Sequence, residues 1–212
     1  MRDFSLNDGP FSSLLKTKGI TTFRESCDYI AALPYGRNSQ RVDLTSVISE
    51  EKGTCSSKHG FLGRVLEENR IDDIHLIAGI FLMSPETHPV LSEFFKGKRY
   101  TSLPEMHCYL RSEGERYDYT TSVDRMPFIA PKIIREQRIE PHQTVDWKVK
   151  IHQEYIKAWL LRNPQIEISF RRSGRIGKSV VDCFRDWKGA SVCSVILLLL
   201  CVETRSLHQS SR

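Results

Sequence analysis

The 212-residue chain lacks several features that would assign it to a class at once. Its first ten residues, MRDFSLNDGP, carry acidic side chains and lack the apolar stretch of a secretory signal. It has neither internal repeats nor low-complexity segments, which argues against a repeat architecture. Its six cysteines are irregularly spaced, unlike a disulfide framework. We therefore expect a cytoplasmic protein with reduced thiols.

The chain also lacks a net charge over most of its length. The formal charge is +5, but residues 171–212 hold eight Lys or Arg and three Asp or Glu, so residues 1–170 are neutral. A neutral domain without a basic stripe is a poor surface for a polyanion. We therefore expect no nucleic-acid partner.

Two motifs near the C-terminus are incomplete. The apolar run at 190–202 has thirteen residues, and a membrane-spanning helix needs roughly 17–25, so we regard a membrane anchor as disfavoured although the run leaves it open. The segment GRIGKS resembles a phosphate loop, but Arg172 stands where the first glycine of that motif is required. The break in charge and composition near residue 170 predicts a domain over 1–170 and an atypical basic and apolar tail over 171–212.

The pattern within 1–170 predicts helices and strands in separate stretches. The predicted elements are helical pieces at 11–19 and 21–33, a helix from about 55 to 69, a buried strand at 73–83, a hairpin at 106–121 and a long helix at 142–164. In the last helix, we expect Val145, Val149, Tyr155, Ile156, Trp159 and Leu160 to face inward.

Cys55 lies between a glycine loop and the start of the predicted helix at 55–69, with Thr54 as its expected N-cap. The exposed N–H groups and the dipole of a helix N-terminus favour negative charge, so they lower the pKa of a thiol placed there. Because the thiolate is the nucleophilic form, Cys55 is the candidate nucleophile. Gly60, within the same helix, predicts close packing against a neighbouring segment.

A thiolate nucleophile needs a histidine and a group that orients it. In the hairpin MHCYLRSEGERYDYTT, a two-residue turn at Glu113 and Gly114 places Asp118 diagonal to His107 on one face. A turn shifted by one residue places the two side chains directly opposite, whereas a three-residue turn would separate them. Cys108 is expected to point to the other side of its strand.

The segments KGTCSSKHGFL and MHCYLRSEGERYDYT together resemble the transglutaminase-like superfamily of cysteine enzymes. The resemblance covers about residues 20–170 and is greatest for single-domain members with the GTCSSKH signature. It implies an α+β fold with a papain-like core, in which the cysteine-bearing helix packs on an antiparallel sheet. It also implies a catalytic triad of Cys55, His107 and Asp118, with a peptide or another amide-containing substrate.

The expected function is therefore hydrolysis or acyl transfer through a thioester on Cys55, with no cofactor and no metal. Two alternatives remain open at this point. A silent binding module would keep the fold without an activated thiol. A metal site would use Cys55, His59 and His107 with Asp118, because His59 follows Cys55 by one helical turn.

Overall fold

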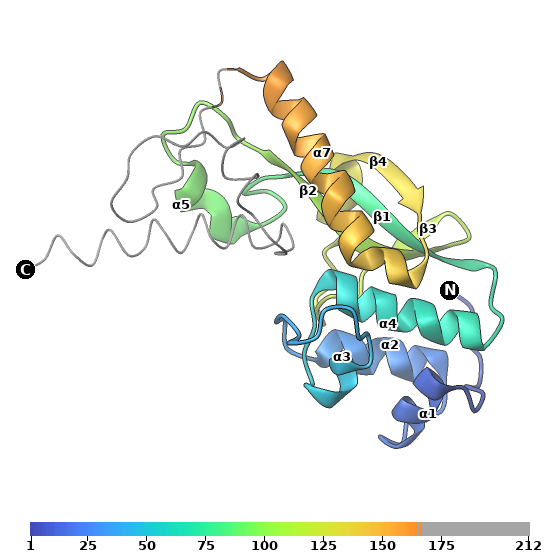
Figure 1. Cartoon of the computed structure of the whole chain (residues 1–212). Coiled ribbons are helices and arrows are strands. Elements are labelled where there is room, and N and C mark those ends of the chain that lie inside the picture. The colour runs from blue at the N-terminus through green and yellow to red at the C-terminus, as the bar shows by residue number, and fades with distance from the viewer. Residues whose placement is uncertain (165, 167–212) are drawn as a thin grey trace, which may run out of the picture. The chain divides into compact units, whose positions relative to one another are not determined.

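The computed structural model describes residues 1–164 and residue 166 (Figure 1). The predicted boundary at residue 170 and the apolar run at 190–202 therefore lie outside the described residues. The described helices are α1 (Pro10–Lys16), α2 (Phe23–Ala32), α3 (Ser46–Ser49), α4 (Cys55–Glu68), α5 (Ser92–Phe95), α6 (Met126–Ile129) and α7 (Asp146–Arg162), with short 3-10 helices η1 (Pro89–Leu91), η2 (Ala130–Lys132) and η3 (Pro141–Thr144). The described strands are β1 (Ile74–Met83), β2 (Leu103–Ser112), β3 (Glu115–Tyr117) and β4 (Ile133–Arg138).

The four strands form one antiparallel sheet in the order β3-β2-β1-β4, so the α+β class is confirmed. β1 is the predicted buried strand, and its apolar run lies in the middle of the sheet. β4 pairs with β1, for example at Ile77 with Arg138, and was not predicted. Its sequence IIREQR carries mostly exposed or half-exposed side chains, so it lacks the apolar alternation by which strands are recognised.

The hairpin between β2 and β3 has the first of the two registers considered above. Ser112 pairs with Glu115, and Arg111 pairs with Arg116. Glu113 and Gly114 form the two-residue turn with φ of 52° and 85°. Positive φ at both positions matches the right-handed twist of the flanking strands. The predicted turn is therefore confirmed, although β3 ends before it reaches Asp118.

The chain divides into two compact units. One contains Met1–Phe81 and Met106–Lys148, and the other contains Leu82–Glu105 and the described residues from 149 to 166. In the second unit, the buried His152 of α7 makes a hydrogen bond of 3.1 Å to the carbonyl oxygen of Pro104. All candidate site residues lie in the first unit.

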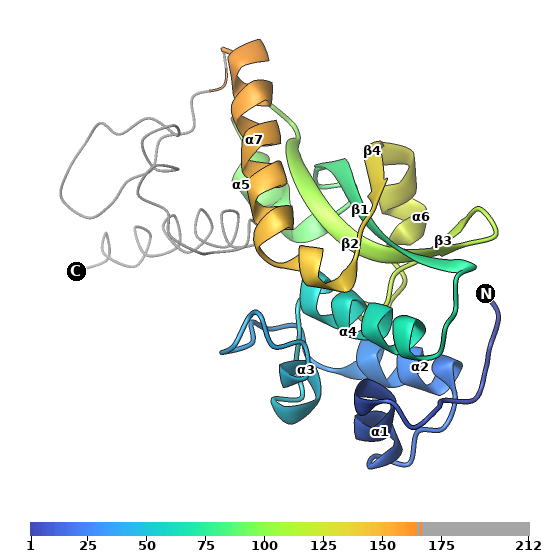
Figure 2. The same ribbon diagram turned by 45° about the vertical axis from the view of Figure 1, so that its right-hand side comes forward.

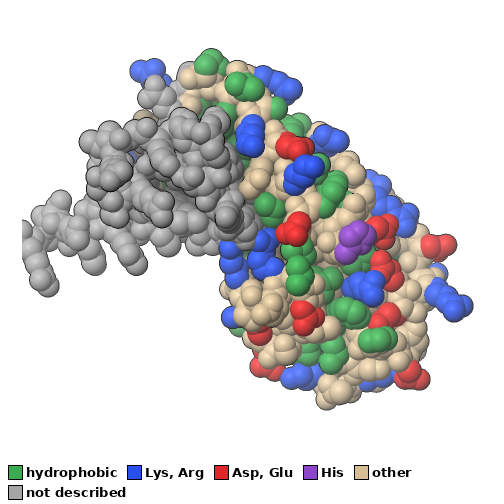
Figure 3. All heavy atoms as spheres, viewed as in Figure 1, with side chains coloured by type: hydrophobic (Ala, Val, Ile, Leu, Met, Phe, Trp, Pro, Cys, Tyr) green, Lys and Arg blue, Asp and Glu red, His purple; other side chains and the backbone are tan. Residues whose placement is uncertain are grey.

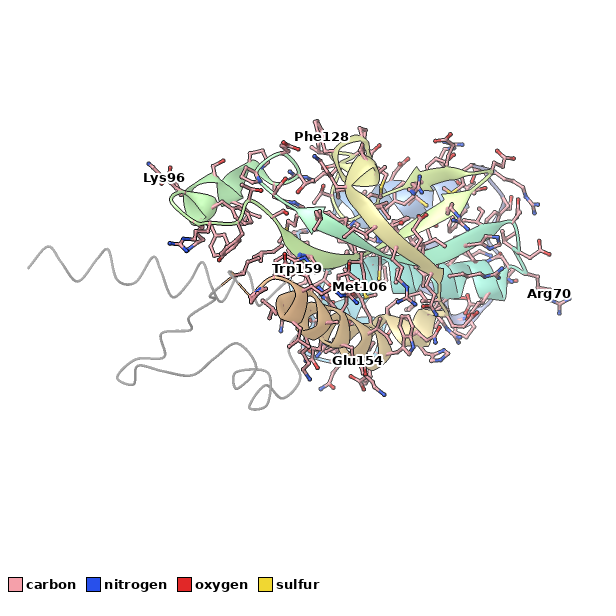
Figure 4. The ribbon with its side chains drawn as sticks, turned by 90° about the horizontal axis from the view of Figure 1, so that it is seen from above. Arg70, Lys96, Met106, Phe128, Glu154 and Trp159 are labelled. Carbon is pink, nitrogen blue, oxygen red and sulfur yellow. The ribbon has the colours of Figure 1, made fainter. Side chains whose placement is uncertain are left out.

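α4 is the central helix of the first unit. It contacts α1, α2, α3 and η3, and Figures 1 and 2 both show it between the other N-terminal helices and the sheet. Thr54 caps it as predicted, through a reciprocal pair of hydrogen bonds with Ser57. At the other end, the N–H of Ile71 bonds the carbonyl of Leu66 across Arg70, which has φ of 55°. Figure 4 shows Arg70 projecting away from the unit at this end.

Gly60 confirms the expected close packing of α4. A Cβ atom there would lie 2.8 Å from Oγ1 of Thr144 and 3.1 Å from a methyl carbon of Leu44. Thr144 belongs to η3, which covers this part of the helix. Because Gly60 has no side chain, η3 can pack closely against this part of α4.

The prediction for the long helix was wrong in two respects. α7 begins at Asp146 after the separate 3-10 turn η3, rather than at His142. Its buried residues are Lys148, His152 and Ile156, while the other five residues expected to face inward are only half-buried. Two of the three positions that repeat at one-turn spacing are polar, so the apolar pattern did not reveal the buried face.

The surface of the described chain carries both signs of charge. In Figure 3, Lys and Arg side chains are interspersed with Asp and Glu side chains over the visible face. Within residues 1–164 and 166, none of the helices combines the length and the apolar character needed to cross a membrane.

Gly79 of β1 gives a test of the packing beneath the candidate site. A Cβ atom there would lie 2.6 Å from the hydroxyl oxygen of Tyr109, a side chain that is fully buried. Gly79→Ala should therefore lower the free energy of unfolding by about 1–3 kcal/mol, the usual cost of overpacking a core. Urea denaturation measures this change.

Gly36→Ala is the matched control, because the added methyl group would meet only the flexible side chain of Lys52. We expect its effect to stay within about 0.5 kcal/mol of zero. Equal stability of the Gly79→Ala variant and the parent chain would contradict the packing described for Tyr109.

Candidate active site

Cys55 is the first residue of α4, as the sequence predicted, and only 3% of it is exposed. Thr54 and Ser57 fix the start of the helix around it. The neighbouring Gly53 brings the chain close to the same turn, because a Cβ there would lie 2.8 Å from Cγ of Lys58 and 2.9 Å from Oγ of Ser57. The thiol is therefore held at a helix N-terminus in a closely packed environment.

His107 and Asp118 meet as the hairpin geometry predicted. Nε2 of His107 lies 2.9 Å from Oδ2 of Asp118. The other carboxylate oxygen accepts hydrogen bonds from the backbone N–H and the hydroxyl group of Thr120, at 3.0 and 2.6 Å. Asp118 is buried, and these partners hold its carboxylate toward the imidazole.

The imidazole of His107 also interacts with the side chain of Cys55. Since Nε2 is occupied by Asp118, Nδ1 is the ring nitrogen left for this interaction. Burial lowers the pKa of His107, but the negative charges of Asp118 and Cys55 raise it by more, so the net pKa is well above the ordinary value. Burial raises the pKa of Asp118, and His107 opposes this strongly enough to bring the net pKa below its usual range.

The three residues are therefore arranged in series: thiol, imidazole and carboxylate. Burial raises the pKa of Cys55, but the positive charges of Lys148 and His107 lower it more, and the resulting pKa is about 5. At neutral pH this arrangement places a thiolate beside an imidazolium. An ionised thiol in contact with a protonated imidazole is the pair of groups that nucleophilic catalysis by cysteine requires.

Lys148 is a fourth member of the site that the sequence analysis did not identify. Its ammonium group lies 3.4 Å from Sγ of Cys55 and 2.8 Å from Oγ of Ser56, and only 4% of the residue is exposed. Lysine is rarely buried, so a pattern that sorts residues by hydrophobicity assigns Lys148 to the outer face of its helix. The one-turn spacing of Lys148 and His152 is the only signal in the sequence, and it is weak.

Cys108 of β2 is a further thiol near Cys55. Its backbone lowers the pKa of the Cys55 thiol, and its own side chain interacts with Ser56. Burial raises the pKa of the Cys108 thiol, and the nearby negative charge of Cys55 raises it further. Its raised pKa keeps Cys108 protonated beside the Cys55 thiolate, and the expectation that its side chain points to the other side of the strand stays a prediction.

His59 occupies the position considered for a metal ligand, but its ring nitrogens are used by the backbone. Nδ1 lies 2.9 Å from the carbonyl oxygen of Cys55, and Nε2 accepts the backbone N–H of Tyr119 at 2.9 Å. A carbonyl can only accept, so Nδ1 carries the proton and the ring is neutral. Burial lowers the pKa of His59 to about 4. Among the described residues, no group of three or more His, Cys, Asp and Glu side chains is arranged to hold a metal ion.

Lys58 lies beside His59 on α4 and ties the same loop to the helix. Its buried ammonium group donates to the carbonyl oxygens of Leu33 and Thr120, at 2.5 and 2.8 Å. Burial lowers its pKa to about 8, and Asp118 partly opposes this. His59 and Lys58 together hold the backbone that follows Asp118, at Tyr119 and Thr120, against the helix that begins with Cys55.

Comparisons with protein-family models, with curated proteins and with solved structures found no match to this chain.

The pKa values predict a large difference in reactivity among the described thiols. Cys55 should react with iodoacetamide with a midpoint near pH 5, whereas the pKa values of Cys27 and Cys108 are raised by burial. Mass spectrometry of labelled peptides over a series of pH values measures each midpoint. Cys27 is the internal control, and equal labelling of Cys55 and Cys27 at neutral pH would contradict the ionised state of Cys55.

The lowered pKa of His59 predicts that the free energy of unfolding decreases in acid. Its pKa in the folded protein, about 4, lies below the ordinary 6.5, so the unfolded chain binds one more proton between these values. Stability therefore falls as the pH falls from 6.5 to 4, by about 1.4 kcal/mol per pH unit for one proton. Urea denaturation at several pH values measures the slope, to which Cys55 also contributes.

His59→Gln isolates the contribution of the imidazole. Glutamine places an acceptor near the N–H of Tyr119 without a group that titrates in this range. The difference in unfolding free energy between the parent chain and the variant should shrink, or reverse, as the pH falls toward 4. A difference that does not depend on pH would show that His59 is not held neutral in the folded protein.

Proposed function

We propose that the chain is a cysteine hydrolase or acyltransferase that acts on an amide-like bond. The observation that carries this proposal is the hydrogen bond between His107 and Asp118 beside the buried thiol of Cys55, whose pKa is lowered to about 5. The position of the thiol at the start of a helix, with the histidine on a neighbouring strand, supports assignment to a papain-like, transglutaminase-like core. The substrate class is then a peptide or another amide-containing molecule.

In the first step, the Cys55 thiolate attacks the carbonyl carbon of the substrate and forms a tetrahedral intermediate. The backbone N–H of Cys55, in the first turn of α4, is the proposed donor to the resulting oxyanion. The His107 imidazolium then gives its proton to the leaving nitrogen as the C–N bond breaks. A thioester on Cys55 and a neutral imidazole remain.

In the second step, neutral His107 takes a proton from water or from an amine, which attacks the thioester. Collapse of the intermediate releases the acyl product and regenerates the thiolate and the imidazolium. Asp118 stabilises the imidazolium and holds the ring in one orientation, through the bond of 2.9 Å. Water as the acceptor makes the enzyme a hydrolase, and an amine makes it a transferase.

The direct test is capture of an acyl adduct. The full chain is incubated with a library of activated acyl esters and amides, and intact-mass and peptide mass spectrometry locate any thioester. We expect the adduct on Cys55 and its release by hydroxylamine. Cys55→Ala should abolish it. A parent chain that neither labels rapidly with iodoacetamide nor accepts an acyl group would favour the silent binding module instead.

The Asp118→Asn variant tests whether Asp118 supports His107 in the reaction. The amide is neutral and presents a different set of donors to His107, so the rate of acyl transfer should fall by roughly 10²–10⁴-fold while the fold is kept. Asp72→Asn, at an exposed position, is the matched control and should keep the parent rate. A parent-like rate in Asp118→Asn would remove Asp118 from the mechanism.

A further inference from the structure

The burial of the Lys148 ammonium group beside Cys55 requires a physical explanation. Lys148 is only 4% exposed, and removing an ammonium group from water is unfavourable unless an anion or several acceptors compensate it. Two of its contacts are Sγ of Cys55 at 3.4 Å and Oγ of Ser56 at 2.8 Å. Of these two atoms, only the sulfur becomes negatively charged at neutral pH. The contact is therefore a charge-assisted one when Cys55 is a thiolate.

His107 has a task that conflicts with holding the thiolate. In the proposed reaction it must lose its proton to the leaving nitrogen, and its other ring nitrogen is already bonded to Asp118. The proposed steps take no proton from Lys148, so in this mechanism its positive charge stays beside the reacting atoms throughout. The two cations thus reach the same sulfur from different elements, β2 and α7.

We propose that Lys148 is a catalytic residue of the acyl transfer described above, on which this inference rests, and that its ammonium group stabilises first the Cys55 thiolate and then the oxyanion. During attack, a lone pair of Sγ forms the C–S bond and the π electrons of the carbonyl move to its oxygen. The negative charge therefore leaves the sulfur and appears two bonds away, still within reach of Nζ. No proton moves in this step, and no other reactant is needed.

The charged groups around Cys55 are consistent with this assignment. The sulfur is influenced by Lys148 from α7 and by His107 from β2, and Cys108 of β2 adds its backbone and a protonated thiol. Asp118 acts on Cys55 through His107, to which it is bonded. His59, whose ring is neutral, contacts the backbone of Cys55. Lys148 is thus the cation beside the sulfur whose charge does not change during the reaction.

A permanent positive charge beside the sulfur also predicts how the site selects reagents. An anionic alkylating agent should be attracted to Sγ relative to a neutral agent of nearly the same size. Iodoacetate and iodoacetamide form such a pair. The ratio of their rates at Cys55 reports the local charge independently of how much thiolate is present, since both agents react with the same thiolate.

The experiment measures both alkylation rates at Cys55 over a series of pH values, in the full-length parent chain and in three variants. Lys148→Met removes the charge and keeps an unbranched side chain, Lys148→Arg keeps the charge, and Lys150→Met is the control at an exposed position on the same helix. Lys148→Met should lower the iodoacetate-to-iodoacetamide ratio by roughly tenfold, the order expected for one contact between unit charges. Lys148→Arg and Lys150→Met should keep the parent ratio.

The labelling midpoint of Cys55 gives a second readout. It should rise from about 5 in Lys148→Met, and in His107→Ala it should remain below the value near 8.5 of a free cysteine, because Lys148 still contacts the sulfur. If Lys148→Met fails to fold, Lys148→Gln and the parent chain are compared in the same way. An unchanged reagent ratio in a folded, uncharged variant would overturn the proposal.

The outcome is separable from that of the proposed function. Both proposals stand if Lys148→Met lowers the iodoacetate-to-iodoacetamide ratio and also slows acyl-adduct formation at a pH where Cys55 is fully ionised in both proteins. If the reagent ratio falls but the parent chain forms no acyl adduct, the charge assignment holds and the proposed acyl transfer fails. If adducts form equally fast in the parent chain and in Lys148→Met with equal reagent ratios, the proposed function stands and Lys148 has no part in it.

Discussion

The structure around α4 depends on one constraint: a negative charge on a buried sulfur atom must be compensated by groups of the protein. Only 3% of Cys55 is exposed, so water contributes little to stabilising a thiolate there. Burial alone would keep the thiol protonated, as it does for Cys27 in α2. The ammonium group of Lys148, the imidazole of His107 and the backbone of Cys108 together reverse that preference.

These compensating groups impose requirements on distant parts of the chain. His107 must be held by a carboxylate, and the loop that carries Asp118 must therefore stay close to α4. Two side chains of α4 itself, Lys58 and His59, bind the backbone of that loop at Thr120 and Tyr119. Both are buried with lowered pKa values, so the arrangement that supports the charged site has its own electrostatic cost in stability.

The two positive groups beside Cys55 differ in what they can do during a reaction. His107 has a pKa raised by Asp118 and Cys55 against the effect of burial, and it is suited to giving and taking one proton. Lys148 adds a second positive group beside the sulfur. In the mechanism proposed above, the tasks of ionising the nucleophile and of transferring protons are separated, whereas in a simple thiol–imidazole pair they fall to one residue.

Several features of the site follow from short-range rules and were therefore predictable from the sequence. Thr54 before Cys55 indicates where α4 begins, since capping is decided within one turn. The Glu113-Gly114 turn fixes the register of the hairpin and so the meeting of His107 with Asp118, because strand pairing alternates with a period of two residues. The individual helices and the hairpin likewise followed from local patterns, whereas the α+β class with its antiparallel sheet was implied by the resemblance.

Tertiary structure alone decided the rest. Lys148 lies 93 residues from Cys55 in the chain, and its burial beside the sulfur reverses the preference of lysine for solvent. The same is true of Lys58, whose partners at Leu33 and Thr120 come from two separate segments. Edge strand β4 formed from a sequence with little apolar alternation, because pairing with β1 satisfies its backbone. Long-range charge compensation and strand pairing depend on which segments meet in space, and one-dimensional patterns do not contain that information.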